Sequence, residues 1–456
     1  MRILPVTKPL QGTVQVPGDK SVTHRAIMFA SIARGESLIV GGGDGEDNIS
    51  TIRVMGQLGV PIETSEEGIR VQGVGLHGLR ATDEPLDCGN SGTTARMMVG
   101  LLAGAGIRAT LIGDESLSIR PMARVAAPLE ELGYRLDTSG ERKTMPMHVV
   151  PTDNDERDKK DVRAVLKIAS AQVKSCIMLS GLWRSAVTQV VEPSPSRDHT
   201  ERLLRAMGRR VESTKHYFDP VGTASDEQLP AATLLPGGEL RGGRLEIPGD
   251  FSSAAFIIAA ALVAGEKVTI QNVNTNPTRI GMLNVLKRMG AKISETNRKV
   301  LTTGEPVADL VVERSELTGT VVEGAEIPLL IDEIPVLAVV GAMCTGTLEI
   351  RNAEELRVKE SDRVVTTGNI LRGMGVQFEE LPDGIRVEGQ GRAGWSGFTV
   401  DAAHDHRIAM AAAVAALGAT SETTVTGASA ILISYPSFSA TLRTLGAELD
   451  DPGAHA

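Results

Sequence analysis

Six segments of the chain share one pattern, and this internal repeat constrains the fold more than any other feature. Each segment reads as an amphipathic helix that ends in Leu or Met, then a glycine, then a short strand. The six glycines stand 71–85 residues apart, at Gly59, Gly133, Gly208, Gly290, Gly375 and Gly446. Glycine suits this position because the residue after a helix often adopts the left-handed conformation. The spacing predicts six copies of one supersecondary unit.

A second helix, apolar on nearly all sides, precedes each of these segments and is itself followed by a strand. These helices are expected at 25–35, 94–104, 173–183, 254–265, 335–346 and 407–418. A helix that is apolar all round belongs inside a core. The predicted fold class is therefore α/β, with six βαβαββ repeats in a two-domain inside-out barrel arrangement. Three repeats form each domain, with buried helices inside and sheets outside.

The domain boundary is expected after the third repeat. The glycine-rich stretch 236–243 lies there and has the composition of a linker. The charged stretch 153–163 is expected to form a solvated loop.

Composition narrows the partner class. The chain has 57 acidic and 47 basic residues, a net charge of −10, and only 3% aromatic residues. It therefore lacks the positive charge and the stacking rings of a nucleic-acid binder. Net charge alone would also disfavour small anionic substrates.

Cysteine usage and apolar runs indicate a reduced, cytoplasmic protein. Cys88, Cys176 and Cys344 lie far apart without a CxxC pair, so neither a disulfide framework nor a metal site is expected. The apolar run 254–264 is shorter than the roughly 20 residues that span a bilayer. The N-terminal segment does not read as a signal peptide. We expect no membrane association.

Polar residues gather at the start of each apolar helix. Any single Ser or Asp there is explained as an N-cap. The cations Lys20, Arg25, Arg96 and Arg407 are harder to explain, since a helix N-terminus already carries partial positive charge. Their placement is favourable if anions bind there. If the helices of the two domains direct their N-termini toward one another, the space between the domains is an anion cleft.

Two familiar phosphate motifs are absent. The run 12–21 lacks the glycine spacing of a Walker A loop, and the run 41–46 lacks the last glycine of the dinucleotide fingerprint. A nucleotide kinase or a dehydrogenase is therefore disfavoured. The charge cluster 357–363 fits a solvated face and a binding loop equally well.

The motifs, in chain order, resemble those of the 5-enolpyruvylshikimate-3-phosphate synthase family of enolpyruvyl transferases. They are VPGDKSVTHRA, GNSGTTARMM, SIRPM, SAQVKS, GDFSSAAF, IDEIPVLA, RVKESDR and DHRIAMA. The resemblance implies two domains that close on substrate. It assigns 19–244 to a middle domain, and 1–18 with 245–456 to a C-terminal-type domain, with the active site in the cleft between them. It implies transfer of the enolpyruvyl group of phosphoenolpyruvate to the 5-hydroxyl of shikimate 3-phosphate, in the pathway to chorismate and the aromatic amino acids.

The resemblance also implies residue roles. Asp332 would take the hydroxyl proton, Glu360 would protonate the methylene carbon, and Lys20 would contact both substrates. Shikimate 3-phosphate would be held by Lys20, Ser21, Arg25, Ser170, Ala171, Gln172, Arg197, Asp332 and Lys359. Phosphoenolpyruvate would be held by Lys20, Gly92, Arg120, Gln172, Arg363 and Arg407. Arginine suits carboxylate and phosphate because its planar fork donates two parallel hydrogen bonds. No metal or cofactor is implied, and we expect a monomer.

Three positions depart from the family pattern. Ile433 stands where many members have lysine, Glu355 where many have asparagine, and Ala171 where many have a second serine. Because Ile433 replaces the lysine, one phosphoenolpyruvate contact of the family is not assigned to a residue here. Gly92 is the residue that the family associates with glyphosate binding, so the resemblance predicts sensitivity.

Two alternatives stay open at this stage. The first is the related transferase that acts on UDP-N-acetylglucosamine, although the loop Gly113–Arg120 lacks the cysteine typical of it. The second is a non-catalytic repeat scaffold that binds anions, which would have no need of Asp332 and Glu360.

Overall fold

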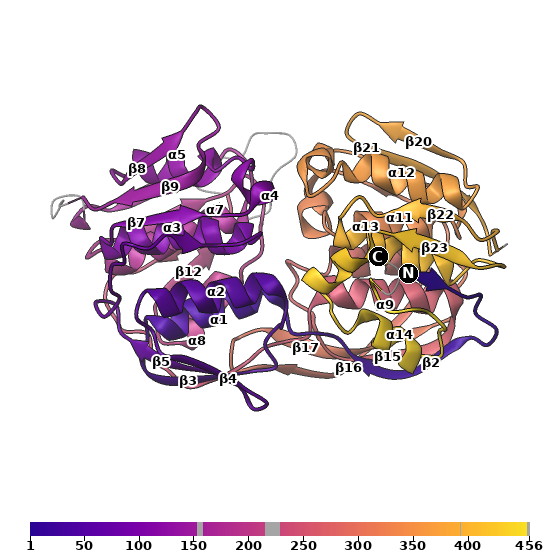
Figure 1. Cartoon of the computed structure of the whole chain (residues 1–456), viewed down its shortest axis with the longest axis horizontal. Coiled ribbons are helices and arrows are strands. Elements are labelled where there is room, and N and C mark those ends of the chain that lie inside the picture. The colour runs from indigo at the N-terminus through magenta and orange to yellow at the C-terminus, as the bar shows by residue number, and fades with distance from the viewer. Residues whose placement is uncertain (153–157, 215–228, 393, 454–456) are drawn as a thin grey trace. The chain divides into compact units, whose positions relative to one another are not determined.

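The computed structural model describes residues 1–152, 158–214, 229–392 and 394–453 (Figure 1). The chain divides into two compact units. Unit 1 comprises Met1–Gly18, Pro248–Lys299 and Pro306–Ala456, and unit 2 comprises Asp19–Ile247 and Val300–Glu305. Residues 153–157 of the expected charged loop lie outside the described residues, whereas Val162–Val165 forms strand β10.

Three nearly apolar helices form the interior of unit 2, as the sequence predicts. They are α1 (Lys20–Ser31), α3 (Gly92–Ala105) and α7 (Ala171–Ser180). The more amphipathic helices α2 (Glu46–Gln57), α5 (Ala123–Glu131) and α8 (His199–Ala206) pack beside them. The described residues of this unit also form the short helices α4 (Glu115–Ser118) and η1 (Gly181–Trp183). The side chains of Asp19, Ser91 and Ser170 cap the inner helices by accepting backbone N–H bonds.

Unit 2 has three four-stranded sheets of one topology. The first has the order β14 (Arg244–Glu246), β3 (Arg34–Val40), β5 (Gly68–Val74), β4 (Ile62–Ser65). The second has the order β6 (Leu86–Asp87), β7 (Ala109–Ile112), β9 (Thr144–Val150), β8 (Arg135–Ser139). The third has the order β10, β11 (Thr188–Val191), β13 (Ala231–Leu234), β12 (Val211–Thr214). Each begins with a parallel pair and continues with two antiparallel pairs.

Unit 1 repeats this arrangement. Its inner helices are α9 (Phe251–Ala264), α11 (Ile334–Gly341) and α13 (His406–Ala416), and every described residue of α11 is buried. Its second helices are α10 (Gly281–Arg288), α12 (Arg363–Gly373) and α14 (Phe438–Thr444). The 3-10 helices η3 (Gly324–Leu329), η4 (Glu354–Val358) and η5 (Ala428–Ile433) lie in its loops. Figure 1 shows β2, β15 and β16 along one side of unit 1 and β20 and β21 along the opposite side.

Two sheets of unit 1 have four strands and one has three. The four-stranded sheets have the orders β2 (Leu10–Gln15), β15 (Gly265–Asn274), β17 (Pro306–Glu313), β16 (Lys292–Val300), and β18 (Val321–Val322), β19 (Thr345–Ile350), β21 (Gly384–Gln390), β20 (Phe378–Leu381). In the third sheet β23 (Thr423–Thr426) pairs in parallel with β22 (Thr399–Asp401) and antiparallel with the N-terminal β1 (Arg2–Ile3). The N-terminal segment thus supplies strands to unit 1.

The glycine that ends each repeat helix has the predicted conformation. All six are left-handed, with φ between 71° and 105°. The sixth repeat differs after its glycine: the expected strand is reduced to an isolated bridge between Leu449 and Ile3. The segment 236–243 is also not a linker, because Leu240 is buried and its carbonyl accepts the N–H of Arg34. The expected mixed α/β class, with helices inside and small sheets outside, is confirmed.

Candidate active site

Five of the predicted site residues lie together in unit 1. This unit 1 cluster comprises Asp332, Lys359, Glu360, Arg363 and Arg407. Asp332 lies before α11, Lys359 and Glu360 follow η4, Arg363 begins α12, and Arg407 lies in the first turn of α13. The Asp332 carboxylate is 3.9 Å from Lys359 Nζ, 3.7 Å from Arg363 Nη1 and 3.8 Å from Arg407 Nη2. Arg407 Nη1 also donates to the Asp332 carbonyl at 3.0 Å. Three cations therefore surround one carboxylate.

Arg363 is the centre of the unit 1 cluster. Its side chain is 1% exposed, and it donates to Asp405 Oδ2 at 2.8 Å and to Glu360 Oε2 at 2.5 Å. Burial by itself lowers the pKa of Arg363, but the carboxylates of Glu360, Asp405 and Asp332 together raise it above its ordinary value. Burial alone would likewise raise the pKa of Asp405, yet Arg363 holds it below its usual range. Arg363 is therefore permanently charged.

A second buried ionic group, which the sequence did not reveal, lies behind the unit 1 cluster. Glu333 is fully buried, and its Oε1 accepts the Ser252 hydroxyl at 2.5 Å and lies 3.4 Å from Arg279 Nη1. Arg407 Nη1 is 3.7 Å from the same oxygen. The group therefore fixes Arg407 and the backbone beside Asp332. Ser252 and Arg279 belong to the fourth repeat, whereas Glu333 belongs to the fifth and Arg407 to the sixth. Their proximity therefore had no local signal in the sequence.

In unit 2, α1 and its N-terminus carry Lys20, Ser21 and Arg25. Lys20 forms an ion pair with Asp47 on α2. Arg25 is buried, and it donates to Thr200 Oγ1 at 2.7 Å, to Ser175 Oγ at 2.8 Å and to the Ser21 carbonyl at 2.9 Å. Burial lowers the pKa of Arg25 to about 10, so it stays protonated at neutral pH.

The start of α3 brings Gly92 close to two guanidinium groups. A Cβ at Gly92 would lie 2.9 Å from Arg96 Nη1 and 3.6 Å from Arg120 Nη1. Arg120 donates to Asn90 Oδ1 at 2.9 Å and to Ser116 Oγ at 3.0 Å. The glycine therefore leaves space beside two cations at the N-terminus of α3. This combination suits an anion.

The start of α7 joins this group through Gln172. Its side-chain carbonyl accepts from Arg96 Nη1 at 2.9 Å, and its amide donates to Thr93 Oγ1 at 3.1 Å. Ser170, Ala171 and Gln172 are half-buried, and so is Arg197 in the segment before α8. The predicted residues of unit 2 thus lie in the first two turns of α1, at the N-termini of α3 and α7, between α4 and α5, and in the segment before α8. We call them the unit 2 group: Lys20, Ser21, Arg25, Gly92, Arg120, Ser170, Ala171, Gln172 and Arg197.

The structure also shows what the unusual positions do. Glu355 Oε1 lies 3.3 Å from Lys359 Nζ, so this glutamate pairs with a predicted contact of shikimate 3-phosphate. Ile433 ends η5 as a half-buried apolar residue, so that position supplies no cation. In the cluster 357–363, Arg357 pairs with Asp362 and bonds the carbonyls of Leu381 and Pro382. Only part of that cluster faces the site.

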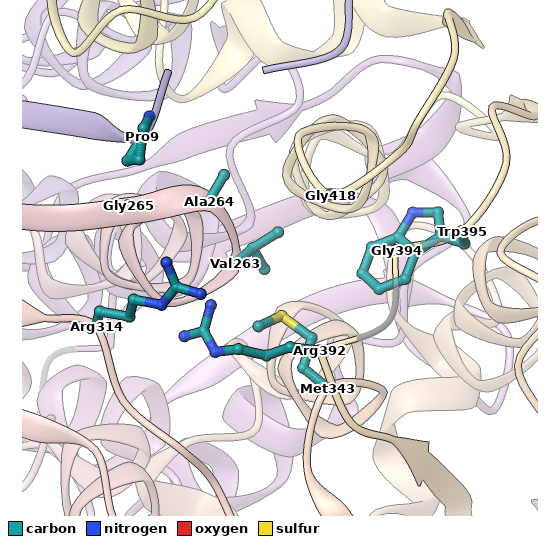
Figure 2. Close-up of a pocket in the computed structure, with 10 residues that line it drawn as sticks. All are labelled: Pro9, Val263, Ala264, Gly265, Arg314, Met343, Arg392, Gly394, Trp395 and Gly418. Carbon is teal, nitrogen blue, oxygen red and sulfur yellow. The ribbon is translucent and has the colours of Figure 1, made fainter. Parts of the chain in front are cut away.

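Other features of the described residues lie apart from these side chains. No helix in the described part of the chain is long and apolar enough to cross a membrane. The described residues contain no group of three or more His, Cys, Asp or Glu side chains placed to hold a metal ion. A cavity of about 210 Å³ in unit 1, shown in Figure 2, is lined by Arg314, Arg392 and Trp395 among others, and by none of the predicted site residues.

Comparison with known proteins gives one consistent result. Residues 5–442 match the model of the family described as EPSP synthase (3-phosphoshikimate 1-carboxyvinyltransferase). The 3-phosphoshikimate 1-carboxyvinyltransferase of Hydrogenovibrio crunogenus is 42% identical over 96% of this chain and 95% of its own length. That of Acaryochloris marina is 44% identical over 96% of this chain and 94% of its own length.

Solved structures agree. EPSP synthase from Acinetobacter baumannii superposes with a TM-score of 0.85 at 38% identity, covering 99% of each chain. The enolpyruvyl transferase NikO from Streptomyces tendae has a TM-score of 0.75 at 16% identity, covering 98% of this chain and 97% of its own. The second match concerns the fold alone.

Proposed function

Because the chain belongs to the EPSP synthase family, we propose that it transfers the enolpyruvyl group of phosphoenolpyruvate to the 5-hydroxyl of shikimate 3-phosphate and releases phosphate. The observation that carries this proposal is the unit 1 cluster. It combines two carboxylates suited to proton transfer, Asp332 and Glu360, with three cations suited to anionic substrates.

The charge of the two substrates matches the cations available. Each substrate carries one phosphate and one carboxylate, so four anionic groups must leave water together. We propose that the unit 2 group and the unit 1 cluster act on the same substrate pair. Lys20, Ser21, Arg25, Ser170, Ala171, Gln172, Arg197, Asp332 and Lys359 would hold shikimate 3-phosphate, and Lys20, Gly92, Arg120, Gln172, Arg363 and Arg407 would hold phosphoenolpyruvate. Holding both substrates in reacting positions itself lowers the barrier by several kcal/mol.

Asp332 acts as the base in the proposed reaction. It accepts the proton of the 5-hydroxyl as that oxygen bonds to C2 of phosphoenolpyruvate, while Glu360 gives a proton to the methylene carbon. Loss of phosphate from C2, with return of a proton from the new methyl group to Glu360, restores the carbon–carbon double bond and forms the enol ether of the product. The overall balance transfers the hydroxyl proton to the departing phosphate. General acid–base catalysis of this kind contributes typically about 10²–10⁴ in rate.

Arg363 influences whether Glu360 holds its proton, and this influence changes when a substrate binds. At 2.5 Å it stabilises the ionised form of Glu360, whereas a general acid must hold its proton. A substrate anion bound to Arg363 would compete for the same N–H group and so favour the protonated acid. In this scheme, substrate binding prepares Glu360 for its role.

The proposed reaction is tested by phosphate release from phosphoenolpyruvate with two acceptors in parallel. Shikimate 3-phosphate should support turnover, and UDP-N-acetylglucosamine should not. A preference for the sugar nucleotide would contradict the proposal. If no phosphate is released with either acceptor, the non-catalytic scaffold is favoured.

Gly92 gives a second, narrower test. Glyphosate should inhibit in competition with phosphoenolpyruvate, and Gly92→Ala should weaken inhibition and raise the KM for phosphoenolpyruvate. The reason is that the new Cβ would lie 2.9 Å from Arg96 Nη1. Turnover unaffected by millimolar glyphosate would contradict this expectation.

We further propose that the protein acts in the cytoplasm as a monomer. Its three cysteines are buried free thiols, which suits a reducing compartment. Sedimentation at micromolar concentration should give a mass near 48.2 kDa, and a dimer mass would contradict the monomer.

A further inference from the structure

A buried lysine lies one turn into α7, beneath the predicted phosphate contacts. Lys174 Nζ pairs with Glu192 Oε2 at 2.8 Å and with Glu201 Oε1 at 2.9 Å, and all three side chains are at most 4% exposed. Burial by itself lowers the pKa of Lys174, but the two carboxylates raise it above its ordinary value. The lysine is therefore charged, and its charge is already balanced by carboxylates.

Glu192 has two further contacts that Glu201 lacks. Its Oε1 accepts the backbone N–H of Ser170 at 3.0 Å, and its Oε2 accepts the hydroxyl of Ser196 at 2.9 Å. Ser170 is the N-cap of α7, and Ser196 directly precedes Arg197. One carboxylate thus joins the two segments that carry Ser170 and Arg197, which are proposed contacts of shikimate 3-phosphate.

We propose that Glu192 is a positioning residue for the phosphate of shikimate 3-phosphate. It acts through Ser170 and the segment of Arg197, and it does not touch the substrate. This inference rests on the proposed function, because the substrate assignment of Ser170 and Arg197 comes from there. A direct contact is unfavourable, since a buried carboxylate would repel the phosphate.

Lys174 explains how a carboxylate is tolerated beside an anion site. Without the lysine, Glu192 and Glu201 would add two negative charges next to the phosphate. With it, Glu192 serves as a fixed hydrogen-bond acceptor with much of its charge offset. Sites that bind anions need their donors held to within a fraction of an ångström, so a rigid acceptor behind Ser170 matters for affinity.

Glu201 provides a matched control. Glu192→Gln and Glu201→Gln each remove one negative charge that pairs with Lys174, and the two glutamate side chains are equally buried. By charge alone, both substitutions should leave anion affinity equal or higher. Glu201 does raise the pKa of Arg25, but Arg25 remains protonated at neutral pH. Only Glu192→Gln alters the support of Ser170 and Ser196.

The experiment is calorimetric titration of each full-length variant with shikimate 3-phosphate in the absence of phosphoenolpyruvate. Glu192→Gln should weaken binding about tenfold, the order of one hydrogen bond to a charged group. Glu201→Gln should stay within twofold of the unsubstituted protein. Thermal unfolding of both variants checks that each is folded at the titration temperature.

Two results would overturn the inference: an unchanged affinity in Glu192→Gln, or equal changes in both variants. If Glu192→Gln does not fold, Ser196→Ala replaces it, since it removes the hydroxyl that donates to Glu192 Oε2 without changing charge. A threefold or greater loss of affinity in Ser196→Ala supports the proposal, and no loss overturns it. Failure of the unsubstituted protein to bind shikimate 3-phosphate would instead contradict the proposed function.

Discussion

The arginines of the two groups of site residues have different surroundings, although Lys20 of the unit 2 group pairs with the Asp47 carboxylate. In the unit 1 cluster, Arg363 contacts Glu360, Asp405 and Asp332, and Arg407 lies near Asp332 and Glu333. In the unit 2 group, Arg25 is held by two hydroxyls and a carbonyl, and Arg120 by a side-chain amide and a hydroxyl. Carboxylates surround the cations of unit 1, whereas neutral oxygens hold these two arginines of unit 2.

This difference indicates a division of labour, by which we mean that one group mainly binds substrate and the other mainly transfers protons. A guanidinium held by neutral groups keeps its full charge for a substrate anion. A guanidinium surrounded by carboxylates has much of its charge already balanced, but it fixes those carboxylates in place for proton transfer. We therefore propose that the unit 2 group mainly binds shikimate 3-phosphate and that the unit 1 cluster carries out the chemical steps. The following variants test that assignment, from the largest expected effect to the smallest.

Asp332→Asn should reduce kcat by about 10²–10⁴, because the amide cannot accept the hydroxyl proton. Phosphate release at saturating substrates measures this loss. Asp451→Asn is a suitable control, since the Asp451 side chain in unit 1 is 70% exposed and should leave kcat unchanged. A kcat within tenfold of the unsubstituted value would show that Asp332 does not act as the base.

Arg363→Met should destabilise the protein by about 3–5 kcal/mol, since it leaves the buried Asp405 carboxylate without its partner. Urea denaturation monitored by circular dichroism gives the free energy of unfolding. Arg288→Met breaks an exposed pair with Glu326 and should cost only about 0–1 kcal/mol. Equal costs for both would show that burial of Arg363 is not what makes its pairing strong.

Arg25→Lys should raise the KM for shikimate 3-phosphate about tenfold or more while leaving the KM for phosphoenolpyruvate near its original value. Lysine keeps the charge, but it cannot reproduce the planar fork that reaches Thr200 and Ser175 together. Steady-state kinetics with each substrate varied in turn separates the two constants. Equal increases in both would argue against an assignment of Arg25 to one substrate.

Acid should destabilise both units through one buried histidine in each. Burial lowers the pKa of His24 in unit 2 and of His406 in unit 1 to about 3, from 6.5. Between these values the unfolded chain binds protons that the folded chain does not, so stability falls as pH falls from 6.5 toward 3. Each histidine contributes at most about 1.4 kcal/mol per pH unit.

The variants His24→Gln and His406→Gln should each make the fall in stability with acid less steep over that range. The free energy of unfolding at pH 4.5, 5.5 and 6.5 measures the slope. An unchanged slope in either variant would show that the histidine concerned is not kept neutral by burial.

Much of the fold and of the candidate site followed from the sequence, because both depend on local patterns. The six glycines and the apolar helices are local signals, and the motif around Arg363 lies within seven residues. What failed depends on distant residues. The strand expected after Gly446 is reduced to a bridge between Leu449 and Ile3, and the strand that pairs antiparallel with β23 is β1, from the other end of the chain. Similarly, Glu333 meets Arg279 and Ser252 across 54 and 81 residues.

Buried ion networks are the hardest part to predict. Lys174 reads in the sequence as one polar residue in an apolar helix, and Glu192 as the end of a strand. Only the packing of α7 against β11 and α8 makes them partners. No periodic pattern in the sequence indicates such a contact, so the hydrogen bond from Ser170 to Glu192 became visible only in the structure.

The division of labour between the two groups is tested most directly in Glu360→Gln. Glu360 belongs to the unit 1 cluster but is not a proposed contact of shikimate 3-phosphate. Calorimetric titration with shikimate 3-phosphate and the rate of phosphate release are measured on the same preparation. The division predicts a Kd within threefold of the unsubstituted protein and turnover slower by at least about 100-fold. Turnover within tenfold, or a Kd weakened as much as turnover, would contradict it.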